Sequence, residues 1–129
     1  MPSKNNNIYD NAYVHDNVTY HKTVSIYGNA EVYNNVCLYN RTQIYGNAIV
    51  YDNVCTFDNT KIYGNAIVYD NVNIHNDVEI YGNAKIFNDV YLYNKIHIYG
   101  NAIITNNVII SYPNNYNICG KARIKSTMK

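Results

Sequence analysis

A tetrapeptide recurs along the chain at one fixed interval. Ile-Tyr-Gly-Asn begins at five positions, and Ile-Tyr-Asp-Asn begins one interval earlier, so the six starting residues are Ile8, Ile26, Ile44, Ile62, Ile80 and Ile98. A finer period of six runs from Ile8 to Pro113: an aliphatic residue, an aromatic or polar one, Gly/Asp/Asn, usually Asn, a small apolar residue and a variable one. A fixed period of this kind indicates a repeat architecture in which successive units stack.

Each six-residue unit predicts one short strand and one bend. The first residue, such as Ile26, points inward because its neighbours in an extended chain point outward. The third and fourth residues, such as Gly28 and Asn29, tolerate positive φ and make the turn, and the fifth, Ala30, returns inward at the corner. Three units close a triangle, so the sequence predicts an all-β, single-domain solenoid of about seven coils with 18 residues each.

Each corner of the coil has its own residue type. The first corner is always alanine, at Ala12, Ala30, Ala48, Ala66, Ala84, Ala102 and Ala122. The second is always valine, at Val18, Val36, Val54, Val72, Val90 and Val108. The third varies, and a two-residue insertion near 113–115 falls there. Within a single domain, 1–129, we therefore expect a lead-in over 1–7, regular coils over 8–113, a last coil over 114–127 and a tail at 128–129.

This unit resembles the hexapeptide repeat of the left-handed parallel β-helix family, in which an aliphatic residue is followed four positions later by a small apolar one. The resemblance covers residues 8 to about 127. It implies a left-handed coil, although parallel crossovers are generally right-handed. The chain departs from the family at the second position, which is often glycine there and is mostly tyrosine here. In this respect it is most similar to uncharacterised bacterial and phage proteins with tandem Tyr-Gly-Asn-Ala repeats.

The overall composition excludes several classes of function. A net charge of +1 with 15 % charged residues gives no general attraction for nucleic acid or for acidic partners. The start of the sequence has no apolar signal region, and no run of about 18 apolar residues could span a membrane. The three cysteines have no metal-binding spacing, which favours free thiols. We expect a cytoplasmic protein, of a bacterium or of an infected host cell, without membrane association.

Two outer faces of the predicted solenoid carry aromatic columns, because residues one repeat apart stack at about 4.8 Å. The first face has the tyrosine ladder: Tyr27, Tyr45, Tyr63, Tyr81 and Tyr99. Such a ladder either shields the coil or offers a platform for sugars or bases. The second face places isoleucines beside aromatics, and the residues expected to form an interface are Ile49, Tyr51, Ile67, Tyr69, Phe87 and Ile103. Apolar patches on soluble proteins usually mark contact surfaces.

An enzymatic function is the main alternative. Many hexapeptide-repeat proteins resemble trimeric acyltransferases with a histidine base, but the four histidines here occupy ordinary ladder positions: His15, His21, His75 and His97. General-base catalysis also needs an orienting partner and a pocket. His21 and His75 share a face yet lie three rungs apart, about 14 Å, too far to share a zinc ion. We therefore expect no catalytic residue, no metal and no cofactor.

The C-terminal end is basic, with Lys121, Arg123, Lys125 and Lys129 following the last acidic residue, Asp89. These charges could bind nucleic acid, but a charged last coil also prevents solenoids from stacking end to end, and we favour that role. The sequence thus predicts a rigid, non-enzymatic scaffold that binds protein, most simply itself as a dimer or trimer. An acyltransferase-like enzyme and a phage-type inhibitor of a host protein complex are the alternatives.

Overall fold

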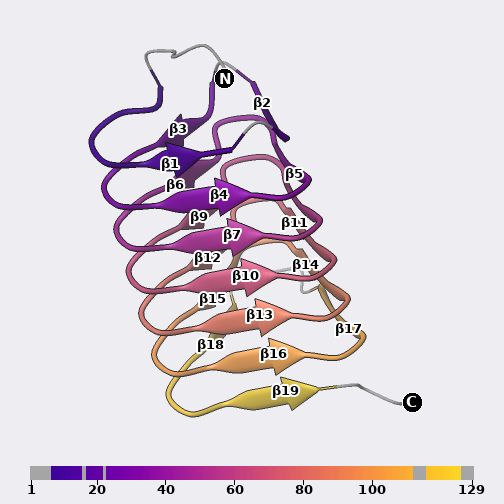
Figure 1. Cartoon of the computed structure of the whole chain (residues 1–129). Coiled ribbons are helices and arrows are strands. Elements are labelled where there is room, and N and C mark those ends of the chain that lie inside the picture. Colours follow the sequence, from indigo (N-terminus) through magenta and orange to yellow (C-terminus); the bar gives the residue numbers. More distant parts are fainter. Residues whose placement is uncertain (1–6, 16, 22, 112–115, 126–129) are drawn as a thin grey trace.

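The computed structural model describes residues 7–125 except 16, 22 and 112–115, with only the backbone of Lys125. Within these residues the chain forms nineteen short strands and no helix (Figure 1). Successive strands fall in turn on three sheets, which are the three faces of a triangular solenoid of about six turns. Residues 1–6 of the predicted lead-in (1–7), the predicted insertion near 113–115 and the end of the chain at 126–129 lie outside the described residues.

The strands of each face follow one another at intervals of three. The first face contains β3 (Ser25–Ile26), β6 (Gln43–Ile44), β9 (Lys61–Ile62), β12 (Glu79–Ile80), β15 (Ile96–Ile98) and β18 (Tyr116–Ile118). The second contains β1 (Tyr13–Val14), β4 (Glu31–Tyr33), β7 (Ile49–Tyr51), β10 (Ile67–Tyr69), β13 (Lys85–Phe87), β16 (Ile103–Thr105) and β19 (Arg123–Lys125). The third contains β2 (Val18–Tyr20), β5 (Val36–Leu38), β8 (Val54–Thr56), β11 (Val72–His75), β14 (Val90–Tyr93) and β17 (Val108–Ser111).

All strand pairs are parallel, and their register follows the repeat. Partners lie one full repeat apart, as for Ile49 with Ile67. The pairings of β15 with β18 and of β16 with β19 are shifted by two further positions, with Ile98 opposite Ile118 and Ile103 opposite Arg123, because the chain holds two additional residues between the partners of each pair. The predicted all-β solenoid with one repeat per turn is therefore confirmed.

The coil is left-handed. In Figure 1 the near strands of the second face run from left to right, and the chain returns behind them while descending from the N-terminus to the C-terminus. A path that turns in this sense while it descends is a left-handed helix, as the family resemblance implies and contrary to the general crossover rule.

The interior is a single column of small and branched aliphatic side chains. The corner alanines and valines from Ala30 to Val108 are fully buried, as are the inward strand residues such as Ile44 and Val68. Two buried threonines share a 2.7 Å hydrogen bond between the Oγ1 atoms of Thr42 and Thr56. The Thr42 hydroxyl is also 2.8 Å from the carbonyl oxygen of Tyr39. Among the described residues no buried side-chain polar atom lacks a hydrogen-bond partner.

Left-handed backbone conformations make the corners. At the first corner one residue has positive φ: Asp10 at 59° in the first coil and glycine at 66–69° in the others, whereas the other two corners use pairs such as Asp52–Asn53, as predicted for these turn residues. The asparagines that follow the positive-φ residue of the first corner form an amide ladder, in which Nδ2 donates to the Oδ1 of the next coil at 3.2–3.3 Å. This ladder runs through Asn11, Asn29, Asn47, Asn65, Asn83 and Asn101.

Candidate interaction surfaces

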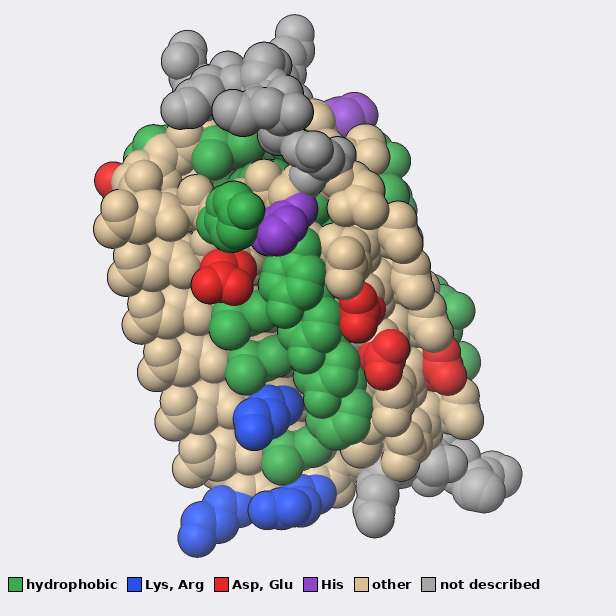
Figure 2. All heavy atoms as spheres, viewed as in Figure 1, with side chains coloured by type: hydrophobic (Ala, Val, Ile, Leu, Met, Phe, Trp, Pro, Cys, Tyr) green, Lys and Arg blue, Asp and Glu red, His purple; other side chains and the backbone are tan. Residues whose placement is uncertain are grey.

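The second face presents two outward columns of side chains. The first column contains Glu31, Ile49, Ile67, Lys85 and Ile103, and the second contains Tyr33, Tyr51, Tyr69, Phe87 and Thr105. We call these ten residues the isoleucine–tyrosine face. It is seen in Figure 2 as a continuous hydrophobic stripe along the solenoid axis, with an acidic side chain near one end and basic side chains near the other. All six residues predicted to form an interface lie in this face.

The aromatic column of this face is a regular stack. The rings of Tyr51 and Tyr69 are 4.8 Å apart at an interplanar angle of 2°, and those of Tyr69 and Phe87 are 4.9 Å apart at 2°. Each half-buried ring is held between its neighbours, and the β-branched isoleucines beside the rings have few rotamers of their own. The face is therefore flat, and its side chains are conformationally restricted in the single chain.

The two ends of the second face have opposite shapes. At the N-terminal end Tyr13 protrudes, with 59 % of its surface exposed, and its ring is tilted against His15 at 4.3 Å. At the C-terminal end the aromatic column stops, because the next residue in the column is the small Thr105. A recess of about 290 Å³ lies there, lined by Phe87, Ile103, Thr105, Arg123 and their neighbours. Neither feature was predicted from the sequence.

The tyrosine ladder of the first face is continuous from Tyr9 to Tyr99. Ring centroids are 4.7–5.0 Å apart and interplanar angles are at most 6°. The predicted members Tyr27, Tyr45, Tyr63, Tyr81 and Tyr99 all belong to it. The ring faces cover one another, so only ring edges and hydroxyls reach solvent. A sugar or base that stacks on an aromatic ring would need a free ring face, which the interior of the ladder does not offer.

One tyrosine of the ladder has a carboxylate partner. The Tyr63 hydroxyl donates to Oε1 of Glu79 at 3.1 Å. Burial raises the pKa of Tyr63 above its ordinary value, and the hydrogen bond to Glu79 raises it further. Burial likewise raises the pKa of Tyr27 and of Tyr45.

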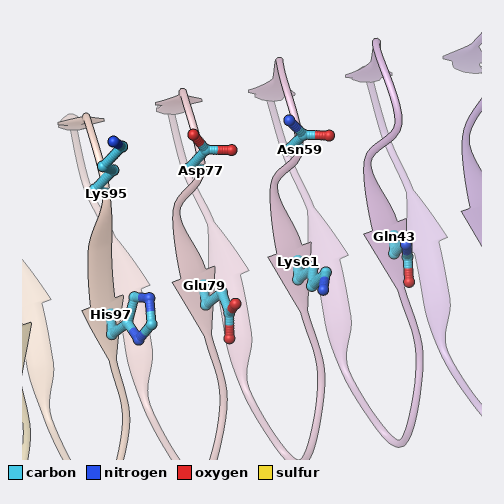
Figure 3. Close-up of a pocket in the computed structure, with 7 residues that line it drawn as sticks. All are labelled: Gln43, Asn59, Lys61, Asp77, Glu79, Lys95 and His97. Atoms are coloured by element: carbon cyan, nitrogen blue, oxygen red, sulfur yellow. The ribbon is translucent and has the colours of Figure 1, made fainter. Parts of the chain in front are cut away.

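A shallow groove of about 490 Å³ runs beside this ladder (Figure 3). Gln43, Lys61, Glu79 and His97 lie in a row on successive strands, and Asn59, Asp77 and Lys95 lie in a second row on the turns. Glu79 is the register partner of both Lys61 and His97, so unlike charges neighbour one another along the row. Of the four histidines, His97 is the one whose strand register partner is a carboxylate, Glu79.

The other histidines are dispersed over the remaining faces. His75 stacks on Phe57 at 4.4 Å, and burial lowers its pKa. His21 packs edge-on against Tyr39, and His15 lies beside Tyr13. Nowhere in the described part of the chain do three His, Cys, Asp or Glu side chains gather in a group that could hold a metal ion.

The cysteines are free thiols, as predicted. Cys37 and Cys55 are register partners on the third face. Burial raises the pKa of Cys55, and the neighbouring Cys37 raises it further, which keeps the thiol protonated and weakly nucleophilic.

The most exposed isoleucine lies on the third face and was not predicted as a contact residue. Ile109 is 68 % exposed, and Tyr91, its partner on β14, is 39 % exposed. β17 is the last strand of its sheet, so Ile109 has a neighbouring strand on one side only. The order of strands in the sheet, read from the repeat, could have indicated this exposure.

The basic C-terminal end is described in part. Lys121 and Arg123 are exposed, whereas the side chain of Lys125 and the whole of Lys129 lie outside the described residues. In the part of the chain that the structure describes, no helix is long and apolar enough to cross a membrane.

Comparison with known proteins is consistent with the geometry. Three stretches, 43–55, 61–76 and 98–112, match the family model described as the YdcK β-solenoid repeat. Each stretch begins at or next to an Ile-Tyr-Gly-Asn repeat. Neither the curated proteins nor the solved structures gave a match. With its three parallel sheets and this repeat, the chain is a parallel β-solenoid repeat protein.

Proposed function

We propose that the chain is a rigid, non-enzymatic scaffold that binds protein, most simply another copy of itself, through the isoleucine–tyrosine face. The observation that carries this proposal is the pre-ordered apolar surface formed by the Ile49 and Ile67 side chains beside the stacked Tyr51 and Tyr69 rings. Continuous apolar patches of this kind on soluble proteins mark contact surfaces.

Rigidity favours binding at such a face. Ordering a flexible side chain on association typically costs about 0.5–1.5 kcal/mol, and this cost is reduced where rotamers are already restricted. The Tyr51 ring is held on both sides, by Tyr33 at 4.9 Å and by Tyr69 at 4.8 Å. Association therefore retains more of the free energy gained from burying apolar area.

Self-association can be tested by sedimentation equilibrium up to several hundred micromolar. We expect a concentration-dependent mass above that of the 14.9 kDa chain, and Ile67→Lys should return it to the monomer. Ile109→Lys is the matched control, because it places the same charge on an even more exposed isoleucine of the third face. A monomeric parent, or equal effects of the two substitutions, would contradict self-association through this face. If the parent is a monomer, the partner of this face would be a different protein, as expected for an inhibitor of a host protein complex.

Acyl transfer is a second candidate, favoured by one observation. His97 lies on the rung next to Glu79 in the groove of Figure 3, an arrangement in which a carboxylate could orient a histidine base. The groove is shallow and is lined by charged and amide side chains, whereas general-base catalysis benefits from a site that excludes water.

A further inference from the structure

The first outward column of the second face, extended by Tyr13 at its N-terminal end, has a sequence of side chains that is complementary to the same sequence read in reverse. From the N-terminal end its members are Tyr13, Glu31, Ile49, Ile67, Lys85 and Ile103, one on each successive strand from β1 to β16. When the column is reversed about the midpoint between β7 and β10, Ile49 is matched with Ile67 and Glu31 with Lys85. The protruding Tyr13 is matched with Ile103, which lines the recess.

We propose that two copies of the chain pack with their isoleucine–tyrosine faces together and their solenoid axes antiparallel. The two-fold axis runs along the strand direction and passes between β7 and β10. This arrangement rests on the proposed function, self-association through the same face, and specifies the partner and its orientation. It is an isologous contact, which closes after two subunits.

The symmetry keeps each column opposite itself and reverses the order of the rungs. Ile49 therefore meets Ile67 of the partner subunit, and Tyr51 meets the partner's Tyr69. With four of the sheet's seven rungs at about 4.8 Å, the apolar centre and its charged flanks extend over about 14 Å along the axis.

Charge decides between antiparallel and parallel packing. Glu31 and Lys85 lie three rungs apart in one chain, about 14 Å, so they do not neutralise each other. The antiparallel arrangement brings Glu31 against the partner's Lys85 on both sides of the axis. A parallel two-fold arrangement would exchange the columns and place Glu31 against the partner's Tyr33, which leaves the carboxylate without a cation at the interface.

The ends of the face fit by shape under the same symmetry. Tyr13 is 59 % exposed, and its rung is matched with that of Ile103 of the partner subunit. The recess of about 290 Å³ opens at that rung, between the Phe87 ring and Arg123. Because each column faces itself, Tyr13 lies opposite Ile103, which lines the recess, and His15 beside it lies opposite Thr105, which also lines the recess. The protruding side chain and the recess thus have one explanation.

The face is narrow, and this sets the expected affinity. Three residues at about 3.3 Å give a strand only about 10 Å wide, so the interface is at the small end of specific contacts. We expect dissociation in the micromolar range, and association should weaken with salt because the flanking pairs are ionic.

Cysteine cross-linking distinguishes the orientations in a background with Cys37, Cys55 and Cys119 replaced by serine. A mixture of Glu31→Cys and Lys85→Cys chains should form a disulfide-linked dimer under mild oxidation, whereas each variant alone should remain monomeric on denaturing gels. Self-cross-linking of Glu31→Cys as efficient as the mixed reaction would overturn the antiparallel arrangement. So would a dimer, established by mass, that gives no mixed cross-link. A monomeric parent would instead refute the self-association on which this arrangement rests.

Charge reversal gives an independent measurement. Glu31→Lys and Lys85→Glu should each weaken dimerisation by about 5-fold or more, and the double variant should recover the parent's dissociation constant to within about twofold. Recovery cannot arise from lost fold stability, since both substitutions are present. Failure of the double variant to recover, with its circular dichroism unchanged, would overturn the Glu31–Lys85 pairing. Filling the recess with Thr105→Tyr should weaken the dimer in the parent background, and an unchanged dissociation constant would exclude Tyr13 from the recess.

Discussion

An added Cβ atom on Gly64 would lie 2.9 Å from the backbone nitrogen of Gly82, on the next coil. The same approach recurs from Gly28 to Gly100, and the backbone of the next coil cannot move away without disturbing the stack. Gly120, at the last coil, has nothing within 4 Å of that position although its φ is also positive, +66°. Substitutions at Gly64 and at Gly120 therefore allow the effect of crowding to be measured separately from that of backbone strain.

Gly64→Ala should destabilise the fold much more than Gly120→Ala. Both substitutions place a side chain in the left-handed region, at about 1–2 kcal/mol, but only Gly64→Ala adds a clash with backbone. We expect a difference between the two variants of about 1–3 kcal/mol, in the range of overpacked cores. Urea denaturation followed by circular dichroism measures it. Equal midpoints would mean that the coils separate easily at this corner.

Ala66→Leu should cost about 1–3 kcal/mol, because three additional carbon atoms have to fit a corner that is fully buried. Ala122→Leu, at the partly buried corner of the last coil, is the control and should cost less. The comparison uses the same denaturation midpoints. A midpoint for Ala66→Leu equal to the parent's would show that the first corner has room to spare.

The tyrosine ladder should make stability fall at alkaline pH. Burial holds the pKa of Tyr27, Tyr45 and Tyr63 above the ordinary value of 10.0. The unfolded chain therefore loses these protons at a lower pH than the folded chain, so stability is retained below about pH 10 and declines as pH rises above it. Absorbance at 295 nm should titrate at higher pH in the native protein than in urea.

Tyr63→Phe isolates the contribution of one rung. It keeps the ring in the stack and removes the hydroxyl that donates to Glu79. The variant should be less stable than the parent at pH 7 and should lose less stability between pH 9 and pH 11. A pH dependence identical to the parent's would show that Tyr63 does not contribute to the alkaline decline.

Replacing His15, His21, His75 and His97 by glutamine should leave the fold and any activity of the protein intact, since each histidine occupies a ladder position on an outer face. The parent should first be assayed with a panel of acyl-CoA donors and amine or hydroxyl acceptors. Loss of a general base typically lowers a rate by about 10²–10⁴-fold, so a required histidine would be obvious. Turnover that disappears with His97→Gln alone would show that the protein is an enzyme and would contradict the proposal of a non-enzymatic scaffold.

The backbone of this protein could be predicted from sequence because each residue of the unit has a separate physical requirement. Gly28 provides positive φ and a close approach, Ala30 fills a narrow corner, and Ile26 fills the core, and these requirements recur in every repeat. Their combination leaves one register, in which Ile26 is opposite Ile44. The handedness of the coil could not be predicted in this way, because the repeat spacing does not specify it. It was predicted from the resemblance to the hexapeptide-repeat family.

The surface features could be predicted only in part. Columns such as Ile49 and Ile67 follow from the period, but the recess depends on what surrounds Thr105 after packing. Exposure also depends on position in the sheet: Ile67 is flanked by strands on both sides, whereas Ile109 lies on the last strand. The complementarity of Glu31 and Lys85 becomes visible only when the order of rungs is considered together with a two-fold axis.

The amide ladder gives the solenoid an electrical polarity. From Asn11 to Asn83 every side-chain amide of the ladder donates toward the C-terminal end, so the five bond dipoles point the same way and add along the axis. Their positive end coincides with the end that carries Lys121 and Arg123. Two such molecules lying side by side repel when they point the same way and attract when one is inverted.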